Sequence, residues 1–321
     1  MTLGYDLLSR LAHLMPRHPK GSLHLLDDAG SMCIDGLEFV IKVDGYALSR
    51  SLYPWCTPRD WGFRAISTAV SDVIAKGCEP MVYAVSIGLP SNWDGKELED
   101  IVHGIVEAVK FYGGYIENVD TNYGVDGWID VFVIGECRIK PIPRGGSLGD
   151  VLVITKPLGL GGACYLAYSR KVKLPRDAAA WGCRPTINPR ITNALERVRH
   201  AIDGSIDVSD TFYESIEALL SPHNLEAFIT VDPREMLEPS YLDLCIELGI
   251  DPYTCGLSTC EDYALLLSVK PQYLEDVLEE LRKVGERPIV IGYVVSKGLG
   301  SWKGKEMKAP RWDHRSKSIT I

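Results

Sequence analysis

The 321-residue sequence lacks the signals of several protein classes. Its longest apolar run, around Met81 to Leu89, is far shorter than the roughly 20 residues that cross a bilayer. Residues 1–20 contain neither a basic region followed by a continuous apolar core nor a small-residue cleavage site, so we expect no signal peptide. The net charge of −9 argues against a nucleic-acid surface, which needs clustered cations. We therefore expect a cytoplasmic protein with neither a membrane nor a nucleic acid as partner.

Several catalytic and metal-binding motifs are also missing. The chain has no Cys-x-x-Cys pair and no Gly-Lys-Ser/Thr after a glycine-rich turn, which argues against zinc fingers and P-loop kinases. Most of the nine cysteines lie in apolar stretches, as Cys164 and Cys245 do, so we interpret them as buried thiols. With 46% hydrophobic and 24% charged residues, the chain has the composition of a globular protein long enough for two domains.

What the sequence does contain is four short apolar or β-branched runs that end on aspartate, each with the length of a strand. The aspartates are Asp27 with Asp28, Asp44, Asp120 and Asp210. Ligands of α/β sheets bind where strands end, and hard cations take carboxylate oxygens as ligands. A single Asp after a strand most often only begins a turn. Four in one chain favour a shared site for metal ions and phosphates.

Strand and helix signals alternate along the chain and predict an α/β (α+β) fold. Thr57 is a suitable N-cap, Pro58 suits a first helical position and Gly77 suits the position after a helix, which predicts a helix from about Pro58 to Lys76. A second helix is expected from Gly95 to Tyr112, with strands on either side. The Pro-, Gly- and Arg-rich stretch from residue 138 to 149 predicts a domain boundary, with domains at 1–140 and 141–321.

The first predicted helix carries an informative carboxylate. Asp72 shares a face with Ala65, Thr68 and Ala69, whereas a solvated face would carry long charged side chains. Such a face fits close approach to a ligand or to another backbone, and a solvent-exposed Asp72 is an equal alternative.

The glycine-rich stretch with Gly159, Gly161 and Gly162 follows a predicted strand and opens a predicted helix. This context favours an anion site built from backbone N–H groups at a helix N-terminus. The spacing is not Gly-x-Gly-x-x-Gly, so the glycines could equally serve close packing alone.

Motifs along the whole chain resemble, in order, those of the thiamine-monophosphate kinase family. The matching stretches are Leu26-Asp27-Asp28-Ala29, Val43-Asp44, Val70 to Pro80, Val119-Asp120-Thr121-Asn122, Arg144 before Gly149-Asp150, Asp207-Val208-Ser209-Asp210, Glu261-Asp262-Tyr263 and Trp312-Asp313-His314. The resemblance is specific for the superfamily that also holds aminoimidazole ribonucleotide synthetase and selenophosphate synthetase. Glu261-Asp262-Tyr263 and the tail favour the thiamine-monophosphate kinase branch.

The resemblance implies a two-domain aminoimidazole ribonucleotide synthetase-like fold, with an N-terminal half that forms a β-barrel at a homodimer interface and a C-terminal α/β domain. It implies ATP held across several Mg²⁺ ions by the metal ligands Asp27, Asp28, Asp44, Asp72, Asp120 and Asp210, of which Asp120 and Asp210 would also be catalytic. The implied nucleotide contacts are Arg144, Gly159, Gly161, Gly162, Thr121 and Ser209. The implied substrate contacts are Glu261, Asp262, Tyr263 and Trp312.

The chain departs from the family pattern at several positions that flank these residues. Val119, Thr211 and Cys260 stand where the family has glycine, and Ser51-Leu52 stands where it has His-Phe. A side chain fills space that a substrate phosphate would otherwise use. We therefore expect weaker binding of thiamine monophosphate than is usual in the family.

The chemistry of a phosphate-monoester acceptor fits a chain rich in placed carboxylates. Such an acceptor has a second pKa of about 6 and is mostly dianionic at neutral pH, so it needs no general base. We expect an ATP- and Mg²⁺-dependent phosphotransferase that converts thiamine monophosphate to thiamine diphosphate. The alternatives are a kinase, ligase or cyclase of the same superfamily acting on another small metabolite, and a non-catalytic nucleotide-binding paralogue.

Overall fold

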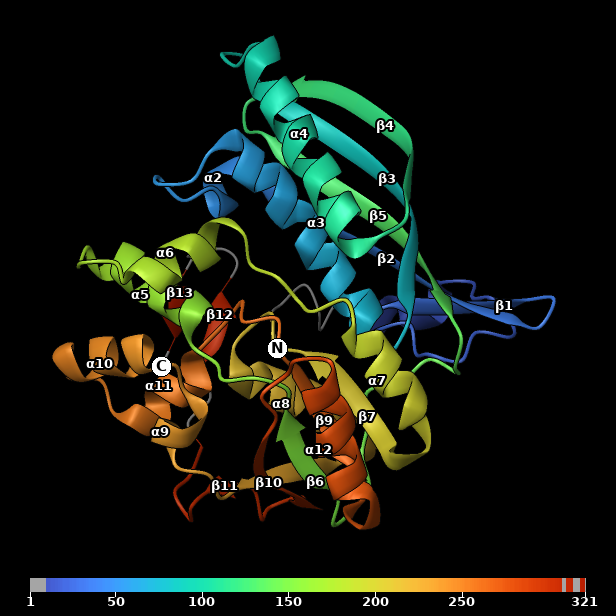
Figure 1. The fold of residues 1–321 in the computed structure, drawn as a ribbon, viewed down its shortest axis with the longest axis vertical. Helices are drawn as coiled ribbons and strands as arrows, with labels where there is room; N and C mark the ends of the chain where they lie inside the picture. The colour runs from blue at the N-terminus through green and yellow to red at the C-terminus, as the bar shows by residue number, and fades with distance from the viewer. Residues whose placement is uncertain (1–9, 308–309, 314–317, 321) are drawn as a thin grey trace.

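The structure is a computed structural model that describes residues 10–307, 310–313 and 318–320. It contains two main sheets, one in each half of the chain, with helices between and around them (Figure 1). The two-domain α/β character expected from the sequence is therefore confirmed. None of the described helices is long and apolar enough to cross a membrane.

The N-terminal half is a five-stranded sheet covered by two long helices. Its elements are η1 (Ala12–Leu14), β1 (Gly30–Ile34), β2 (Leu37–Ala47), α2 (Leu48–Ser51), α3 (Pro58–Ala75), β3 (Glu79–Pro90), α4 (Gly95–Tyr112), β4 (Tyr115–Gly124) and β5 (Trp128–Cys137). The strand order is β1-β2-β5-β3-β4, and among these described strands β3 and β4 form the one parallel pair. Both helices lie on the same face of the sheet (Figure 1).

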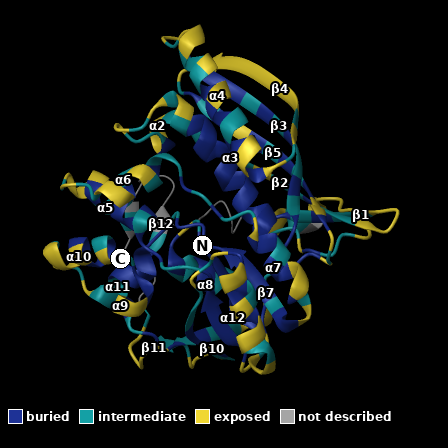
Figure 2. Ribbon diagram, in the orientation of Figure 1, coloured by how far each residue is buried: buried dark blue, intermediate teal, exposed yellow. Residues whose placement is uncertain are grey.

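This sheet is open. The order begins with β1 and ends with β4, and no described residues join those two edges, so the described chain forms no closed barrel by itself and the β-barrel expected at a homodimer interface stays a prediction. The sheet is strongly twisted (Figure 1). Its edge strand β4 has largely exposed residues (Figure 2). Closure would need hydrogen-bond partners for both edge strands, which five strands of this order do not supply.

Helix α3 has the ends that the sequence predicts. Thr57 and Asp60 form a capping box, Pro58 occupies the first helical position, and Gly77 has a left-handed φ of 75° just beyond the helix. From Trp61 to Ala75 every residue is buried, so α3 is a central helix between the two halves of the molecule (Figure 2).

The C-terminal half is a six-stranded sheet with helices on both faces. Its elements are β6 (Val151–Ile154), α5 (Leu160–Arg170), α6 (Arg176–Cys183), α7 (Ile191–Arg197), η2 (Arg199–Ala201), β7 (Ile202–Asp207), α8 (Phe212–Leu220), η3 (Ser221–His223), β8 (Leu225–Ile229), α9 (Pro233–Met236), α10 (Pro239–Glu247), α11 (Pro252–Ser258), β9 (Leu265–Val269), η4 (Pro271–Tyr273), α12 (Leu274–Lys283), β10 (Ile289–Ser296) and β11 (Ser301–Trp302), followed by the small hairpin β12 (Arg311–Asp313) and β13 (Ser318–Thr320). The strand order is β11-β8-β10-β6-β9-β7.

Burial along β6 shows how this sheet is shared between two hydrophobic clusters. Val151 and Val153 belong to the cluster that also contains α3, α4, α7 and α12, whereas Leu152 and Ile154 belong to the cluster beneath α5, α8 and α10. All four side chains are buried because β6 is covered on both faces. The first cluster runs from the N-terminal sheet into the C-terminal half. A boundary between the two domains at residue 140 therefore stays a proposal.

Two local expectations need correction. The run from Leu23 to Leu26 is not a strand, because the backbone turns there and Asp27 N donates to His24 O at 3.1 Å, so Asp27 and Asp28 precede β1 instead of ending a strand. Asp44 and Asp120 lie within β2 and β4, not at their ends.

The interpretation of the cysteines as buried thiols is wrong for six of the nine. Disulfides join Cys56 to Cys183, Cys78 to Cys137 and Cys245 to Cys255, while three cysteines, among them Cys164, are free. Most of these partners are far apart in sequence, so only the fold brings them together.

Candidate functional site

One polar stripe of α3 faces the C-terminal half and organises the site. Thr68 Oγ1 lies 3.0 Å from Tyr263 Oη, Ser71 Oγ donates to Asp207 Oδ2 at 2.6 Å, and Lys76 Nζ, just beyond the helix, donates to Ser205 O at 2.9 Å. Ser71 follows Thr68 by three positions, and Asp72 and Lys76 follow Thr68 at successive spacings of four, so these residues continue one face of the helix. The remaining faces pack on the N-terminal sheet and α4. The stripe therefore joins the two halves along a buried seam.

Four of the predicted metal ligands gather at the C-terminal end of this stripe, together with two lysines. Lys76 Nζ lies 2.6 Å from Asp27 Oδ1 and 2.6 Å from Asp28 Oδ2. Lys42 Nζ of β2 lies 2.9 Å from Asp72 Oδ2 and 3.5 Å from Asp44 Oδ2. The alternative of a solvent-exposed Asp72 is therefore wrong, because its side chain is buried and paired.

Arg144 also belongs to this cluster. Its backbone N donates to Asp27 Oδ2 at 3.0 Å, and its guanidinium pairs with Asp28 Oδ1. Burial favours the neutral acid at Asp28, but Arg144 and Lys76 outweigh burial and hold the pKa of Asp28 below its usual value. Asp28 is therefore a carboxylate fixed in its ionised form.

A fifth carboxylate, Asp207 of β7, completes the group. Ligand oxygens of Asp28, Asp72 and Asp207 all lie within 4.8 Å of one another, and all three residues are buried. Burial, with the Asp28 carboxylate nearby, raises the pKa of Asp207 to about 6. Burial also holds the pKa of Asp72 well above its usual value, and Asp207 adds to that effect.

These three carboxylates fit a Mg²⁺ ion by their chemistry. They are hard oxygen donors on three different segments that converge on one point, and burial, to which the neighbouring carboxylates add, raises the pKa of Asp72 and Asp207 there. A divalent cation between them would remove the mutual repulsion that favours protonation.

A second group, at the other end of the stripe, surrounds Arg64. The guanidinium is almost completely buried, donates to Gly182 O at 2.8 Å and pairs with the Glu261 carboxylate. It lies 5.3 Å from the ring centroids of both Tyr46 and Tyr53. The result is a cation held by aromatic faces and one carboxylate at the seam.

Aromatic rings continue from this group towards the surface. Tyr53 stacks on Trp55 with 4.6 Å between ring centroids, and Tyr168 of α5 packs edge-on to both rings. Trp55 and Tyr168 are exposed, whereas Tyr53 is only partly so. The rings come from both halves of the chain and surround one end of the seam.

The predicted substrate residues Glu261, Asp262 and Tyr263 form a strained segment. Glu261 and Tyr263 have left-handed φ angles of 51° and 46°, which side chains rarely adopt and which concentrate at functional sites. Asp262 accepts from the backbone N–H groups of Gly159 at 2.8 Å and of Gly161 at 3.3 Å. Burial raises the pKa of Asp262 to about 6.

The glycine-rich turn therefore already binds a side-chain carboxyl group, that of Asp262. Close packing also requires its glycines, since a Cβ on Gly161 would lie 1.9 Å from Cys260 O and one on Gly162 would meet Tyr241. The nucleotide contacts expected from Gly159, Gly161 and Gly162 stay a prediction.

Asp120 lies away from the cluster. It is exposed on β4 and pairs with Ser86 of β3. Asp44 of β2 pairs with Val131 of β5, which pairs in turn with Val85 of β3, one residue before Ser86. Successive strand residues point to opposite faces, so the structure does not bring Asp120 to the Asp44 side of the sheet.

Other expected contacts are placed without reaching the centre of the cluster. Thr121 is exposed on β4, and Asp210 is exposed beyond the end of β7, three residues after Asp207. Ser209 is closer, because its Oγ lies 3.4 Å from Asp207 Oδ1. Trp312 lies in β12, paired with Ile319, and His314 lies outside the described residues.

Sequence reasoning missed Asp207, Lys42, Lys76 and Arg64 as members of the site. A signal existed for Lys76 and Arg64, because both continue the helix face of Thr68 and Asp72. No signal in the sequence alone indicated that Lys42 points at Asp72.

The substituted family positions have structural partners. Ser51 Oγ accepts from Trp61 Nε1 at 2.7 Å, and Thr211 caps α8 while donating to Pro310 O at 2.9 Å. Cys260 is buried, and Val119 is half exposed on β4. Ser51, Thr211 and Cys260 are therefore part of the packing of this fold.

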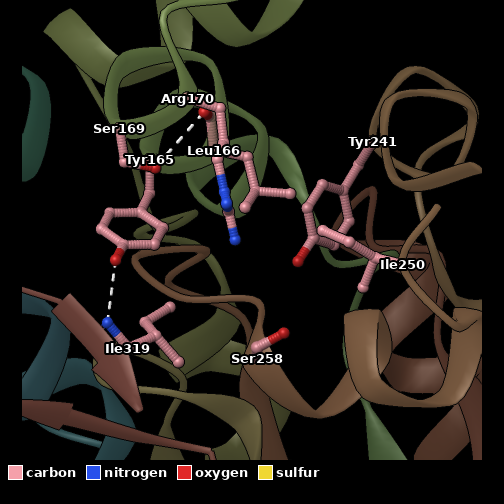
Figure 3. A pocket seen from close by; sticks show the side chains of 8 residues that line it. All are labelled: Tyr165, Leu166, Ser169, Arg170, Tyr241, Ile250, Ser258 and Ile319. Carbon is pink, nitrogen blue, oxygen red and sulfur yellow. Dashed lines mark hydrogen bonds between the residues drawn. The ribbon is translucent and has the colours of Figure 1, made fainter. Parts of the chain in front are cut away.

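A small cavity elsewhere in the C-terminal half contains none of the predicted site residues (Figure 3). At one side of it the backbone N–H of Ile319 donates to Tyr165 Oη at 2.8 Å. Its lining residues are Tyr165, Leu166, Ser169, Arg170, Tyr241, Ile250, Ser258 and Ile319.

Two sheets joined at a buried seam, with carboxylates and cations gathered along it, define a two-domain protein with a site suited to a metal-bound polyanion. Family comparison specifies the group. Residues 26–137 match the N-terminal domain of AIR synthase related proteins, and residues 148–303 match the C-terminal domain. The chain belongs to this family.

Individual relatives agree with this membership. The chain is 24% identical to the thiamine-monophosphate kinase of Pyrococcus abyssi over 98% of this chain and 97% of the relative. Among solved structures, tt0281 from Thermus thermophilus superposes with a TM-score of 0.85 at 24% identity, covering 95% of this chain and 97% of that one. AaThiL complexed with AMPPCP and TMP superposes with a TM-score of 0.81 at 21% identity, covering 98% of this chain and 99% of that one.

Proposed function

We propose that this protein is an ATP- and Mg²⁺-dependent phosphotransferase that phosphorylates thiamine monophosphate to thiamine diphosphate. The observation that carries the proposal is the seam itself, where a buried carboxylate cluster and an arginine enclosed by aromatic rings lie at two ends of one helix. Its support from comparison is a thiamine-monophosphate kinase relative along 98% of the chain.

The carboxylate end would hold the nucleotide. Asp28, Asp72 and Asp207 would hold a Mg²⁺ ion, which when bound neutralises phosphate charge and stabilises the equatorial oxygens during transfer. Arg144 keeps Asp28 ionised through its guanidinium and orients Asp27 through its backbone N–H. The proposal also includes roles in nucleotide binding or phosphate transfer for Asp120, Asp210, Thr121 and Ser209.

The aromatic end would bind the acceptor. Trp55 and Tyr168 are exposed rings on which an aromatic ligand could stack. Arg64, paired with Glu261, supplies charge next to Tyr53, the ring on which Trp55 stacks. Arg64 Nε is buried and has no hydrogen-bond partner among the described residues, so one donor of this guanidinium is not used by the fold. A phosphate monoester needs no general base, and the site must only orient it and exclude water.

Product analysis tests the reaction. Incubation with ATP, Mg²⁺ and thiamine monophosphate should yield ADP and thiamine diphosphate by mass spectrometry. ADP with free phosphate and an unphosphorylated acceptor would indicate the ligase or cyclase chemistry of the superfamily. No nucleotide turnover with any acceptor would indicate a non-catalytic paralogue.

A second experiment tests the acceptor end. Trp55→Ala and Tyr168→Ala should raise KM for the acceptor about tenfold, as expected for loss of a stacking contact worth about 1–1.5 kcal/mol, and should leave KM for ATP unchanged. Equal changes in both KM values would place these rings outside the acceptor site. Competition among phosphorylated metabolites then tests whether thiamine monophosphate is the preferred acceptor.

The proposal includes a homodimer built on the N-terminal sheet. α3 and α4 cover one face, whereas in the described part of the chain no helix covers the other (Figure 1), where Phe39, Ile41, Phe132 and Ile134 are only partly buried. A second copy is the occupant that would cover this face and continue the exposed edge strand β4. Light scattering of wild type and Phe132→Asp tests this: the variant should shift from dimer to monomer, and a monomeric wild type at micromolar concentration would contradict it.

A cytoplasmic location also remains part of the proposal. Disulfides such as Cys56–Cys183 and Cys78–Cys137 persist in intracellular proteins of hyperthermophiles, whereas a reducing cytosol otherwise keeps thiols reduced.

A further inference from the structure

Two lysines lie inside the carboxylate cluster, where the family would place metal ions. Lys76 has no exposed surface, and three oxygens surround its Nζ: Asp27 Oδ1 and Asp28 Oδ2 at 2.6 Å, and Ser205 O at 2.9 Å. An ammonium has three protons, so these oxygens satisfy it completely. Lys42 bridges the other two aspartates, with its Nζ 2.9 Å from Asp72 and 3.5 Å from Asp44.

The fold keeps both charges in place. Burying an ammonium is costly unless carboxylates surround it, and here each lysine has two. Lys42 is paired in this way with Asp72 and Asp44, and Lys76 with Asp27 and Asp28. Neither side chain can leave the cluster without exposing two buried or half-buried carboxylates to each other.

The charges of the cluster also limit how many metal ions it can hold. Asp27, Asp28, Asp44, Asp72 and Asp207 supply five negative charges when ionised, and Lys42, Lys76 and Arg144 supply three positive ones, which leaves two negative charges. Two charges match a single divalent ion. The three carboxylates whose oxygens converge, Asp28, Asp72 and Asp207, are where it would bind.

We propose that Lys42 and Lys76 are built-in cations that replace divalent ions in this cluster, so that the protein alone holds one divalent ion where its carboxylates could hold several. This inference rests on the metal-dependent nucleotide chemistry proposed above. It assigns the two lysines a defined role: Lys76 occupies oxygens of Asp27 and Asp28, and Lys42 occupies oxygens of Asp44 and Asp72, that further ions would otherwise bind. Asp28 and Asp72 still share the one ion with Asp207.

The test is the number of Mn²⁺ ions bound per protomer, measured by equilibrium dialysis of the full chain without nucleotide or acceptor. Wild type should bind one ion. Lys76→Met and Lys42→Met, which keep the length of the side chain but remove its charge, should each bind one ion more. Lys96→Met is the matched control, because Lys96 is exposed at the start of α4, and it should bind as wild type does.

Thermal unfolding supplies a second measurement. Without metal, Lys76→Met should melt below wild type, because Asp27 and Asp28 are then buried without this counter-ion, and added Mn²⁺ should raise its melting temperature more than that of wild type. If Lys76→Met folds only with Mn²⁺, that dependence itself supports the proposal, and Lys42→Met then supplies the number of Mn²⁺ ions bound per protomer.

Outcomes that overturn the inference differ from those that overturn the proposed function. Variants that bind the same number of ions as wild type, or a wild type that binds none or several, would refute the role of the lysines whatever the enzyme does. Absence of ADP formation by a wild type that binds one Mn²⁺ would refute the phosphotransferase and leave the lysine assignment standing.

Discussion

Replacing Cys56 by serine should lower the stability of the whole chain, because the Cys56–Cys183 disulfide joins the segment before α3 to the end of α6 in the other half. A loop of 127 residues closed by a disulfide corresponds to about 5 kcal/mol of lost chain entropy at 25 °C. The Cys78–Cys137 disulfide already closes 59 of those residues, so the effective loop has about 68 residues and the effect is about 4 kcal/mol.

That free energy converts to a measurable shift in melting temperature. Unfolding entropy of about 2.1 cal/mol/K per residue gives about 0.7 kcal/mol/K for 321 residues, so Cys56→Ser should melt about 6 °C below wild type in the absence of reductant. Cys33→Ser is the control, since Cys33 is a free cysteine. Calorimetry that finds Cys56→Ser and Cys33→Ser melting together, with the disulfide of wild type verified by mass spectrometry, would refute the loop-entropy argument.

Three further expectations concern single side chains. Glu261→Ala should lower the free energy of unfolding in urea by about 3–5 kcal/mol, because it leaves the buried Arg64 without a carboxylate. Glu261→Gln should lower it less, and equal losses in the two variants would contradict the charge argument. Asp262→Asn should raise the free energy of unfolding at pH 8 by about 3 kcal/mol, because the folded-state pKa of Asp262, about 6, exceeds the unfolded value of 3.8. The cost of burying Asp262 exists only while its carboxyl is ionised, so the gain should vanish as pH falls from 6 to below 4. A gain that does not change with pH in thermal unfolding across this range would contradict burial as the cause. Gly104→Ala should lower the free energy of unfolding in urea by about 1–3 kcal/mol, since its Cβ would lie 1.8 Å from Arg59 O, and an unchanged midpoint would disprove the close crossing of α3 and α4.

The elements that the sequence predicted well are those with local signals. α4 runs from Gly95 to Tyr112 as expected, and α3 begins at the predicted Pro58, because capping residues and glycines act within one turn of the helix end. The run at Leu23–Leu26 misled because four apolar residues suit a buried turn as well as a strand.

The site was predictable only in part. Asp72 could be singled out from its own helix face, and Asp28 from the motif around it. Lys42 and Asp207 could not, because each acquires its role from a residue on another element: Lys42 of β2 meets Asp72 of α3, and Asp207 of β7 meets Ser71 of α3. Such pairings depend on how distant elements pack together, which no short-range pattern in a single sequence encodes.

The polar stripe of α3 also constrains how the molecule can move. Thr68, Ser71 and Lys76 each bond a buried atom of the other half, and Arg64 adds a fourth attachment at the helix's opposite end. A rotation of one half against the other would break all four at once, and buried polar groups left without partners are costly. Ligands must therefore enter and leave through local rearrangement of loops at the ends of the seam, not through the hinge closure by which many kinases trap their substrates. Turnover would then be limited by short segments, and hydrogen exchange along α3 should stay slow throughout the reaction cycle.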